Sequence, residues 1–600
     1  MADALKQKQE AGAAIGETIA HAFARAFANA KRLVSERKAE AVCAALLLLL
    51  AANLFASISR KSITNDEIVH IPAGYYHLVT GEFQLNNEHP PLVKMWAALP
   101  LLFIQPEEPP APKTEHENFM ERTWGFHERF WQANRARFQT VTFWPRVMMI
   151  PITLGLGALI FIFARKLFGE TAALISVALY VLEPTVLAHG RIVHTDLPAA
   201  FVYLLFFFTL HYYSEAPGLR RALLLGLAGS VALLTKFSML VILPVLAVYL
   251  VARLFLNWRD SRQRSQVALH GGLVTVVIIF LVNAAYHFQH PVLEASDVRW
   301  VQMKSPTLLG FVTTSIRVLS KIIPTYYLFG VYNIELHNHY GHATSLLGQY
   351  SDLGWWYYFP VAFALKTTIP FLLLAVVALG WAGWRLAVKR DKRFVWLVVP
   401  IGVYLAISLT SHINIGIRHF LPVYPFLFIA GGALLAQLQH VRKRIGVAVL
   451  VILFGWMTFE AVRTFPDYTP YMNQLASRHP RWYYLSDSNV EWGDDVGALA
   501  AYLKARGETK VRASLAAAWS TLRLYDVEYL DLTSLPPGST PETRYVAIGA
   551  SELNGSTIFV SQINGVPISQ EQRVNLFASY RNRKPEAVFG GSIYLFREKE

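Results

Sequence analysis

Two adjacent carboxylates follow the first long apolar run of the chain, within Thr64-Asn65-Asp66-Glu67. A carboxylate at a membrane interface can accept the proton of an incoming hydroxyl, which is the chemistry that transfer of a group to an alcohol needs. The same residues also suit a helix cap, with Asn65 or Asp66 starting a helix over residues 68–78. The sequence leaves these two interpretations open.

A second polar motif, Asn87-Glu88-His89-Pro90-Pro91-Leu92-Val93-Lys94-Met95, lies further along the same segment. Its paired prolines fix the backbone and stop a helix. His89 and Lys94 then offer cationic donors that could meet a phosphate. The alternative is a structural turn in which the lysine is anchored at the lipid headgroups.

The composition indicates that these motifs belong to a membrane protein. The chain is 54% hydrophobic and 16% charged, whereas about 25% of the residues of a soluble protein are charged. Several apolar runs reach the ~20 residues that a helix needs to cross ~30 Å of hydrocarbon. We expect about eleven spans, at residues 41–59, 147–164, 172–188, 197–210, 223–234, 240–255, 267–285, 359–382, 394–409, 420–438 and 445–462.

The positions of the basic residues predict how the spans are oriented. The net charge is +14, but the basic groups occur between alternate spans, which is the positive-inside pattern and not the pattern of a nucleic-acid-binding patch. They lie at residues 31–38, 165–166, 220–221, 259–264, 385–393 and 442–444. We therefore expect a multi-pass protein of the inner (plasma) membrane, with no nucleic-acid partner, a cytoplasmic N-terminus and an extracytoplasmic (periplasmic) C-terminus.

The sequence divides into three parts. Residues 1–40 form a cytoplasmic tail, and residues 41–463 form an all-α polytopic membrane domain with long outer loops at 60–143 and 286–358. Residues 464–600 change in character, because short alternating runs such as 544–548 and 592–596 predict β-strands and 494–506 predicts a helix. This last part is expected to be a soluble α/β domain. Within the outer loops, Pro91–Ile104 and Leu308–Ile323 are predicted to be amphipathic helices along the membrane surface.

Further basic side chains are expected on the outer side, against the positive-inside tendency. They are Arg146, Arg191, Lys236, Arg418 and His419, and Asp196 lies among them. Snorkelling to the headgroups could explain any single one. The presence of several basic side chains on the face that also holds the carboxylates favours an anion site. A lipid phosphate is the anion that a membrane offers.

The chain resembles the protein O-mannosyltransferases and their bacterial relatives in three motifs and their order. These are Asp66-Glu67, the string His89-Pro90-Pro91-Leu92-Val93-Lys94-Met95, and Arg146. These belong to the glycosyltransferase C superfamily, which also contains the aminoarabinose transferases that modify lipid A. The resemblance covers roughly residues 40–440 and implies a donor that is a polyprenyl or dolichyl monophosphate sugar. It implies no metal or other cofactor.

The resemblance also implies roles for individual residues. Asp66 would be the general base on the acceptor hydroxyl, and Glu67 and Asp196 would help to hold the acceptor. Arg146 would hold the donor phosphate. The charge and location of further basic residues indicate that they also hold it, namely His89, Lys94, Arg191, Lys236, Arg418 and His419. The reaction would be an inverting transfer, in which the lipid phosphate leaves without help from a general acid.

The acceptor stays open at this point. The chain lacks the β-trefoil insert of the eukaryotic enzymes and carries instead the C-terminal α/β domain and the aromatic segment 354–360, as in bacterial members. A protein serine or threonine, an envelope glycan, and lipid A or another glycolipid are the alternatives. A transporter or flippase is disfavoured, because the polar residues gather at one face and no internal repeat is visible.

Two further polar clusters could form sites. His337, His339 and His342 with Glu335 could bind a metal, but their spacing is not that of a metal site and we expect them to line a substrate entrance. Residues 486–495 are dense in carboxylates and hydroxyls. They could bind an acceptor or Ca²⁺, although a capped helix start after a turn is the favoured interpretation.

Overall fold

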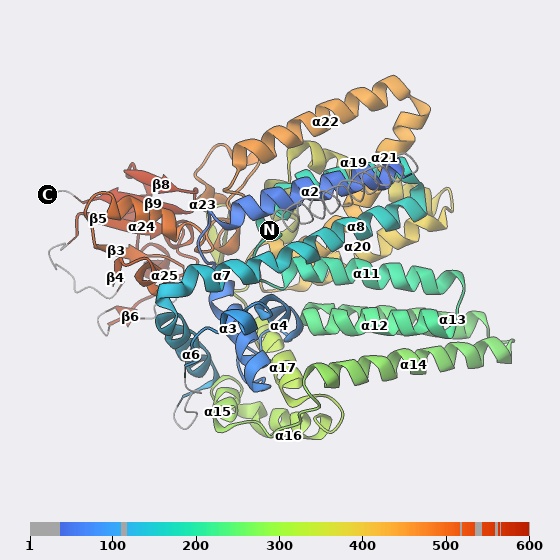
Figure 1. The fold of residues 1–600 in the computed structure, drawn as a ribbon, viewed down its shortest axis with the longest axis horizontal. Helices are drawn as coiled ribbons and strands as arrows, with labels where there is room; N and C mark the ends of the chain where they lie inside the picture. The colour runs from blue at the N-terminus through green and yellow to red at the C-terminus, as the bar shows by residue number, and fades with distance from the viewer. Residues whose placement is uncertain are drawn as a thin grey trace, which may run out of the picture.

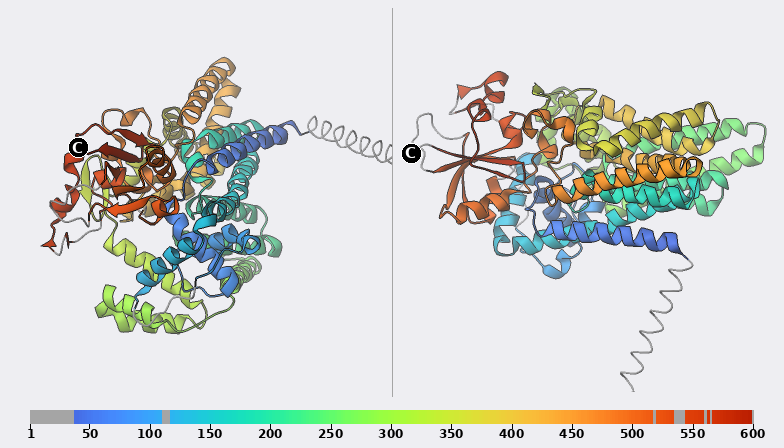
Figure 2. Two further views of the ribbon diagram at one scale, coloured as in Figure 1. Left: turned by 60° about the vertical axis from the view of Figure 1, so that its left-hand side comes forward. Right: turned by 90° about the horizontal axis from the view of Figure 1, so that it is seen from above.

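The computed structural model describes residues 37–109, 117–516, 519–533, 543–558, 562–563 and 566–598. Long helices run side by side in one bundle, and the β-sheet of the C-terminal region lies beyond one end of that bundle (Figure 1). The view from above in Figure 2 shows the same arrangement, with the sheet at one end and the long helices extending away from it. The architecture predicted from the sequence is confirmed: a helical membrane domain with a C-terminal α/β region.

Nine helical segments in the described part of the chain are long and apolar enough to cross a membrane. They are α2 (Lys38–Ile58), η1 with α7 and α8 (Arg135–Arg137, Phe138–Val147 and Met149–Phe168), α11 (Asp196–Glu215), η2 with α13 (Phe237–Val241 and Ile242–Leu256), α14 (Ser261–Ala285), α19 (Ile369–Ala387), η4 with α20 (Lys392–Phe394 and Val395–Thr410), η5 with α21 (Ile417–Val423 and Tyr424–Val441) and α22 (Lys443–Thr464). Each overlaps an expected apolar run, and the run expected at 359–382 is divided between α18 (Tyr358–Lys366) and α19.

The other two expected spans are helical but shorter. One is divided at Glu183 into α9 (Glu170–Leu182) and α10 (Pro184–His189), because a proline begins the second piece. The other is α12 (Leu219–Thr235), whose 17 residues extend about 26 Å at 1.5 Å per residue. The number of crossings therefore stays a prediction.

Burial separates the central helices from the peripheral ones. In the most apolar 18-residue stretch of the segment Ile417–Val441, 78% of the residues are buried within the protein. In the corresponding stretch of α11, 72% are buried. The corresponding window of the segment that contains α13 is only 22% buried, and Val248 and Phe255 on that helix are each 70% exposed. An apolar surface of this kind is compatible with contact to lipid chains.

The turns α11–α12, α13–α14 and α21–α22 lie at the end of the bundle opposite to the C-terminal sheet (Figure 1). These turns carry the basic groups at 220–221, 259–264 and 442–444. The basic turns and the C-terminal sheet thus lie at opposite ends of the helix bundle, as the charge pattern predicts. Which end faces the cytoplasm stays a prediction.

The two long loops fold into short elements at the same end as the sheet (Figure 1). The first contains α3 (Asn65–Thr80), α4 (Leu92–Ala98), α5 (Leu101–Ile104) and α6 (Phe119–Ala133). The second contains α15 (Ala295–Lys304), η3 (Pro306–Leu308), α16 (Leu309–Leu319), α17 (Thr325–Tyr340), β1 (Thr344–Leu346) and β2 (Gln349–Ser351), and α18 (Tyr358–Lys366) follows it. Both stretches predicted to be amphipathic helices contain helical segments.

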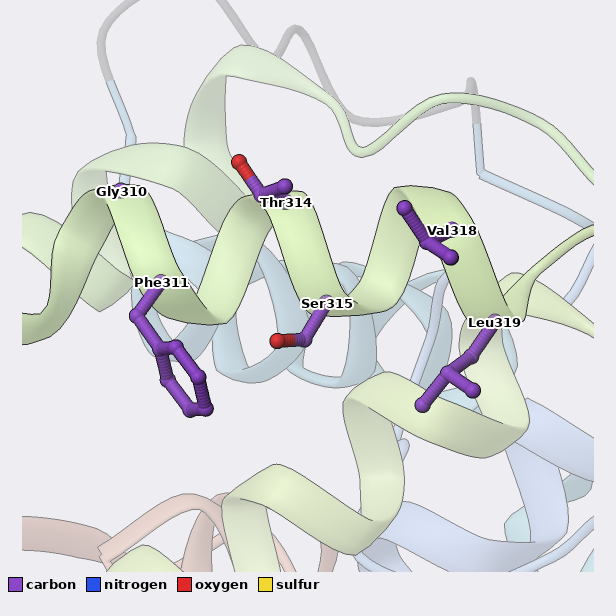
Figure 3. Close-up of a pocket in the computed structure, with 6 residues that line it drawn as sticks. All are labelled: Gly310, Phe311, Thr314, Ser315, Val318 and Leu319. Carbon is purple, nitrogen blue, oxygen red and sulfur yellow. The ribbon is translucent and has the colours of Figure 1, made fainter.

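One side of α16 lines a cavity of about 510 Å³ (Figure 3). Its lining residues are Gly310, Phe311, Thr314, Ser315, Val318 and Leu319. Phe311 is 72% exposed, so this helix presents a large apolar side chain at its surface. The surface agrees with the predicted contact between this helix and lipid.

The C-terminal region is built on a five-stranded sheet of order β4-β3-β5-β9-β8. The strands are β3 (Lys510–Ser514), β4 (Glu528–Asp531), β5 (Tyr545–Gly549), β8 (Ala587–Phe589) and β9 (Ile593–Arg597). Strand β3 is parallel to β4 and β5, and β9 is antiparallel to β5 and β8. Alternate residues of β3, Val511 and Ala513, are buried against α24 (Val496–Lys504), as the two-residue period of a strand requires.

The remaining elements of this region are short. They are η6 (Gln474–Ala476), α23 (Arg481–Tyr484), η7 (Asp487–Asn489), α25 (Trp519–Leu524), α26 (Ala550–Leu553), β6 (Gln562–Ile563), β7 (Val566–Pro567), α27 (Gln570–Val574) and α28 (Ala578–Arg581). The predicted strands at 544–548 and 592–596 and the helix within 494–506 are confirmed.

Candidate active site

The start of α3 sets the positions of the two adjacent carboxylates. The backbone N–H and the hydroxyl of Thr64 both donate to Oε2 of Glu67, at 2.8 and 3.0 Å, in a capping box. The cap is therefore Thr64, and the interpretation that Asn65 or Asp66 caps the helix is wrong. Since Thr64 and Glu67 satisfy the helix start, the Asp66 side chain is free to reach other partners.

Glu67 forms a buried ion pair with Arg146 of α7. Nε and Nη2 of the arginine donate to the two carboxylate oxygens at 2.7 and 2.6 Å, and the two side chains are 2% and 0% exposed. The backbone N–H of Val193 also donates to Glu67, at 3.1 Å. Burial alone would raise the pKa of Glu67, but the arginine holds it below its usual range.

The remaining donors of Arg146 are directed to backbone carbonyls. Nη1 donates to the carbonyl oxygen of Lys61 at 2.7 Å, and Nη2 also contacts that of Ser62. Arg146 thus joins α7 to α3 and to the segment before α3. The side chain is enclosed by protein groups, a different surrounding from that expected for a phosphate ligand.

Asp66 belongs to a cluster of opposite charges drawn from four parts of the chain. Arg418, near the start of η5, contacts the carboxylates of both Asp66 and Asp196, and its Nη1 lies 3.5 Å from Oδ2 of Asp196. Lys236, directly after α12, pairs with Oδ1 of Asp196. His419 Nε2 lies 4.0 Å from the same oxygen. We call Asp66, Asp196, Lys236, Arg418 and His419 the charge cluster.

The charge cluster joins an anionic group that can accept a proton to two cationic groups, Arg418 and Lys236, that can hold a phosphate. Burial alone would raise the pKa of Asp66, but Arg418, with a smaller contribution from His70, holds it below its usual range. The Asp66 side chain is 17% exposed, which makes it the most accessible of the carboxylates that Arg418 contacts. Asp66 is therefore ionised at neutral pH and reachable from outside.

The His-Pro-Pro motif is folded around Lys94 of α4. The lysine Nζ donates to the carbonyl oxygens of Asn86 and His89 at 2.6 and 2.9 Å and to the Asn86 side chain at 3.1 Å. Burial lowers the pKa of Lys94 to about 7. This lysine thus holds its own loop together. A Cβ at Gly74 of α3 would lie 2.1 Å from the Lys94 carbonyl oxygen, so glycine permits the close packing of α3 and α4.

His89 and His70 lie together between this loop and the charge cluster. Their ring centroids are 5.5 Å apart, and His70 is one helical turn after Asp66. Burial lowers the pKa of His70 to about 4 and that of His89 well below its usual value. Both imidazoles are therefore neutral at pH 7, whereas a cationic His89 was expected from the sequence.

Arg191 is fully buried and pairs with Asp494 at 3.0 Å. Asp494 also accepts from the hydroxyl of Thr469 at 2.9 Å. Next to it, Asp495 pairs with Lys61. Arg191 therefore connects the membrane domain to the segment 486–495 of the C-terminal region.

The segment 486–495 lies against the charge cluster, which sequence reasoning did not predict. Trp492 donates from its indole Nε1 to Oδ1 of Asp66 at 3.2 Å, and its ring lies 4.4 Å from the Arg418 guanidinium carbon. The density of polar residues around the tryptophan was the signal, but nothing in the sequence indicated a partner. The favoured interpretation of a capped helix start covers only the last residue, because α24 begins at Val496.

The histidine cluster of the second loop forms a pair. His337 Nε2 and His342 Nδ1 are 3.0 Å apart, and His342 also lies 3.5 Å from Asp487. Within the ranges that the structure describes, no group of three or more His, Cys, Asp or Glu residues is arranged to hold a metal ion.

Part of the chain is similar to a known protein family. Residues 138–286 match the family model described as dolichyl-phosphate-mannose-protein mannosyltransferase. The match covers the part of the chain from α7 to α14. The resemblance inferred from the sequence is confirmed over these residues, which include Arg146.

Three solved structures are similar to the chain at low identity. ArnT from Cupriavidus metallidurans bound to undecaprenyl phosphate is 12% identical, with a TM-score of 0.46 over 92% of this chain and 97% of that one. The Archaeoglobus fulgidus oligosaccharyltransferase in complex with Zn and sulfate is 10% identical, with a TM-score of 0.46 over 85% and 68%. The S. cerevisiae protein O-mannosyltransferase Pmt1-Pmt2 complex bound to the sugar donor is 17% identical, with a TM-score of 0.30 over 42% and 33%. Among curated proteins, no sequence matches the chain.

Proposed function

We propose that the protein is an inverting glycosyltransferase that moves a sugar from a polyprenyl-phosphate donor to a hydroxyl acceptor on the extracytoplasmic face of the membrane. The observation that carries the proposal is the charge cluster, in which Arg418 contacts the accessible carboxylate of Asp66 and lies beside Lys236 and His419. A base and a phosphate-binding group are thus adjacent, as transfer from a phosphate to a hydroxyl requires. The family of residues 138–286 supports the donor class.

In the proposed reaction, Asp66 accepts the proton of the acceptor hydroxyl. The oxygen attacks the anomeric carbon from the side opposite to the phosphate, and the bond between that carbon and the phosphate oxygen breaks. The leaving phosphate takes the bonding electron pair, and Arg418, Lys236 and His419 stabilise its charge. A phosphate monoester anion is a good leaving group, so a single carboxylate suffices.

The bond between Arg418 and Asp66 suggests how donor binding activates the base. While the guanidinium contacts Asp66, it stabilises the ionised carboxylate and makes it a weaker base. A donor phosphate would compete for the same guanidinium, because both anions bind its planar N–H groups. Donor binding would therefore release Asp66 and raise its basicity when an acceptor can be used.

The contacts of the other predicted phosphate ligands favour positioning roles. Arg146 is enclosed by Glu67 and backbone carbonyls, Lys94 by its own loop, and Arg191 pairs with Asp494. We assign the phosphate to Lys236, Arg418 and His419, and we place the neutral His89 beside them. Glu67 and Asp196, expected to hold the acceptor, instead bind Arg146 and Lys236.

The experiment that tests the proposal is incubation of the purified enzyme with a panel of polyprenyl-phosphate sugars and candidate acceptors. The acceptors include a serine- and threonine-containing peptide, a short envelope glycan and lipid A. Mass spectrometry should detect released polyprenyl phosphate and an acceptor heavier by one sugar. If the wild-type enzyme binds these donors but releases polyprenyl phosphate from none of them, the proposal is contradicted.

A further inference from the structure

We infer that Trp492, contributed by the segment after the last membrane helix, is a positioning residue of the active site. Its indole N–H holds the Asp66 carboxylate, and its ring holds the Arg418 guanidinium. The inference rests on the proposed function, in which Asp66 is the base. It gives the C-terminal region a direct part in the transfer reaction.

The contacts of the indole itself are the first observation. Nε1 donates to Oδ1 of Asp66 at 3.2 Å, while the other oxygen, Oδ2, is bound by Arg418. The ring face lies 4.4 Å from the guanidinium carbon of Arg418, a distance at which a cation and an aromatic face attract each other. One side chain thus contacts both members of the central ion pair, and it is only 2% exposed.

The aromatic surroundings restrict the orientation of the ring. His189, the last residue of α10, and His194, between α10 and α11, lie edge-on at centroid distances of 5.5 and 5.6 Å. His194 in turn contacts Asp196 at 3.0 Å. The tryptophan therefore contacts Asp66 directly and is linked to Asp196 through His194.

Backbone contacts anchor the segment of Trp492 to both sides of the charge cluster. On one side, the backbone N–H of Asn65 donates to the Trp492 carbonyl oxygen at 2.9 Å, and that of Ser62 donates to Asp494 at 2.9 Å. On the other side, the N–H of Ile417 donates to the Asn489 side chain at 2.9 Å. These contacts involve the residues immediately before Asp66 and Arg418. The segment therefore sets how far apart the base and the guanidinium lie.

The indole N–H should affect the acidity of the base. A hydrogen bond to an ionised carboxylate stabilises the charged form, so its removal raises the pKa. The other charged or titratable groups that act on Asp66 are Arg418 on η5, His70 on α3, Asp196 on α11 and Glu88 in the loop before α4. These groups are unchanged by a substitution at position 492, so a change in the pH profile reports the loss of the indole contact.

The test is the pH dependence of kcat/KM for Trp492→Phe in the full-length enzyme, with the donor and acceptor on which the wild type is active. Phenylalanine keeps an aromatic face for Arg418 but removes the N–H. We expect the acid limb of the profile to move up by about one pH unit, because loss of one charge-assisted hydrogen bond is worth about a factor of ten. Below the limb, kcat/KM should fall about tenfold at a given pH, while donor affinity stays within about twofold.

Two further variants make the result decisive. Replacement of Trp492 by β-(3-benzothienyl)alanine keeps the bicyclic shape and exchanges the N–H for sulfur, so it should give the same shift even if Trp492→Phe folds poorly. Trp482→Phe, the same change at a tryptophan that packs in the core of the C-terminal region, should leave the profile unchanged. A wild-type profile for a folded Trp492 variant would overturn the inference. Absence of sugar transfer by the wild-type enzyme would instead contradict the proposed function.

Discussion

Removing the charge of Glu67 alone should destabilise the protein strongly. Glu67→Gln keeps the size of the side chain, but its single carbonyl oxygen can accept from the N–H of Thr64 or from that of Val193 and not from both, since these bind different carboxylate oxygens. It also leaves Arg146, which is 2% exposed, without its counter-charge. Burying an unpaired guanidinium is costly, because the charge has lost its water and gains no partner in return.

The expected magnitude follows from the geometry of the pair. Both carboxylate oxygens bind Arg146, at 2.7 and 2.6 Å, and both side chains are buried. Breaking a buried pair of this kind typically costs about 3–5 kcal/mol, which is roughly a 150- to 5,000-fold change in the unfolding equilibrium. Arg146→Met should cost about as much, since it leaves a buried carboxylate.

The double variant Glu67→Gln with Arg146→Met is the control. A neutral pair replaces the ion pair, so most of the lost stability should return, as is typical when both partners of a buried pair are removed. Reversible unfolding in mixed micelles, followed by tryptophan fluorescence, measures the three free energies. Near wild-type stability of Arg146→Met, together with loss of donor binding, would refute this reasoning and restore Arg146 as a phosphate ligand.

Three further predictions concern donor binding, acid stability and topology. Lys236→Met should weaken binding of a polyprenyl phosphate by about 1.5–3 kcal/mol, the value of a hydrogen bond to a charged group, and unchanged affinity by isothermal titration would contradict this. Burial lowers the pKa of His70 to about 4 and that of His127 to about 3. These folded-state values lie below the unfolded value of about 6.5, so the stability of the protein is full above pH ~6.5. As the pH drops below about 6.5, the free energy of unfolding falls by up to about 1.4 kcal/mol per pH unit for each histidine. Thermal unfolding of His127→Phe against the wild type from pH 7.5 to pH 4 should show a shallower loss, and parallel curves would exclude this histidine. Reporter fusions after Lys166, Arg264 and Lys443 should be cytoplasmic and a fusion at the C-terminus external, and a cytoplasmic C-terminus would contradict the shared outer face.

The architecture could be predicted because it depends on local properties of the sequence. Apolar runs of sufficient length specify membrane helices, since a backbone in hydrocarbon must satisfy its own hydrogen bonds. Alternation at 544–548 and 592–596 specifies β5 and β9 in the same way. The two expected spans that form shorter helices than the others, at 172–188 and 223–234, are bounded by a proline start at Pro184 and by the polar end of α12 at Lys236.

The charge cluster could be predicted in its members but not in its pairing. Asp66, Asp196, Lys236, Arg418 and His419 were all selected from the sequence as outer-face charged or titratable groups, and the structure brings them together. Which acid meets which base depends on helix packing over hundreds of residues of separation. No local pattern encodes that packing.

The same limit explains the residues whose surroundings differ from expectation. Arg146 and Lys94 have the charge that a phosphate site needs, but their protein partners, Glu67 and the carbonyl oxygens around Lys94, are visible only once the chain is folded. The role of Trp492 could not be predicted, because nothing near it in the sequence indicates its partner. It lies 426 residues from Asp66, and its segment by itself has the pattern of an ordinary helix start.

The measurement that tests the central claim most directly is the turnover of Asp66→Asn with donor binding measured in parallel. Asparagine keeps the size and much of the hydrogen bonding but cannot accept the proton, and Thr64, not Asp66, caps α3. We expect turnover to fall by a factor on the order of 10² to 10⁴, while the affinity for the polyprenyl-phosphate donor is retained. Turnover close to that of the wild type in Asp66→Asn would contradict the assignment of Asp66 as the general base.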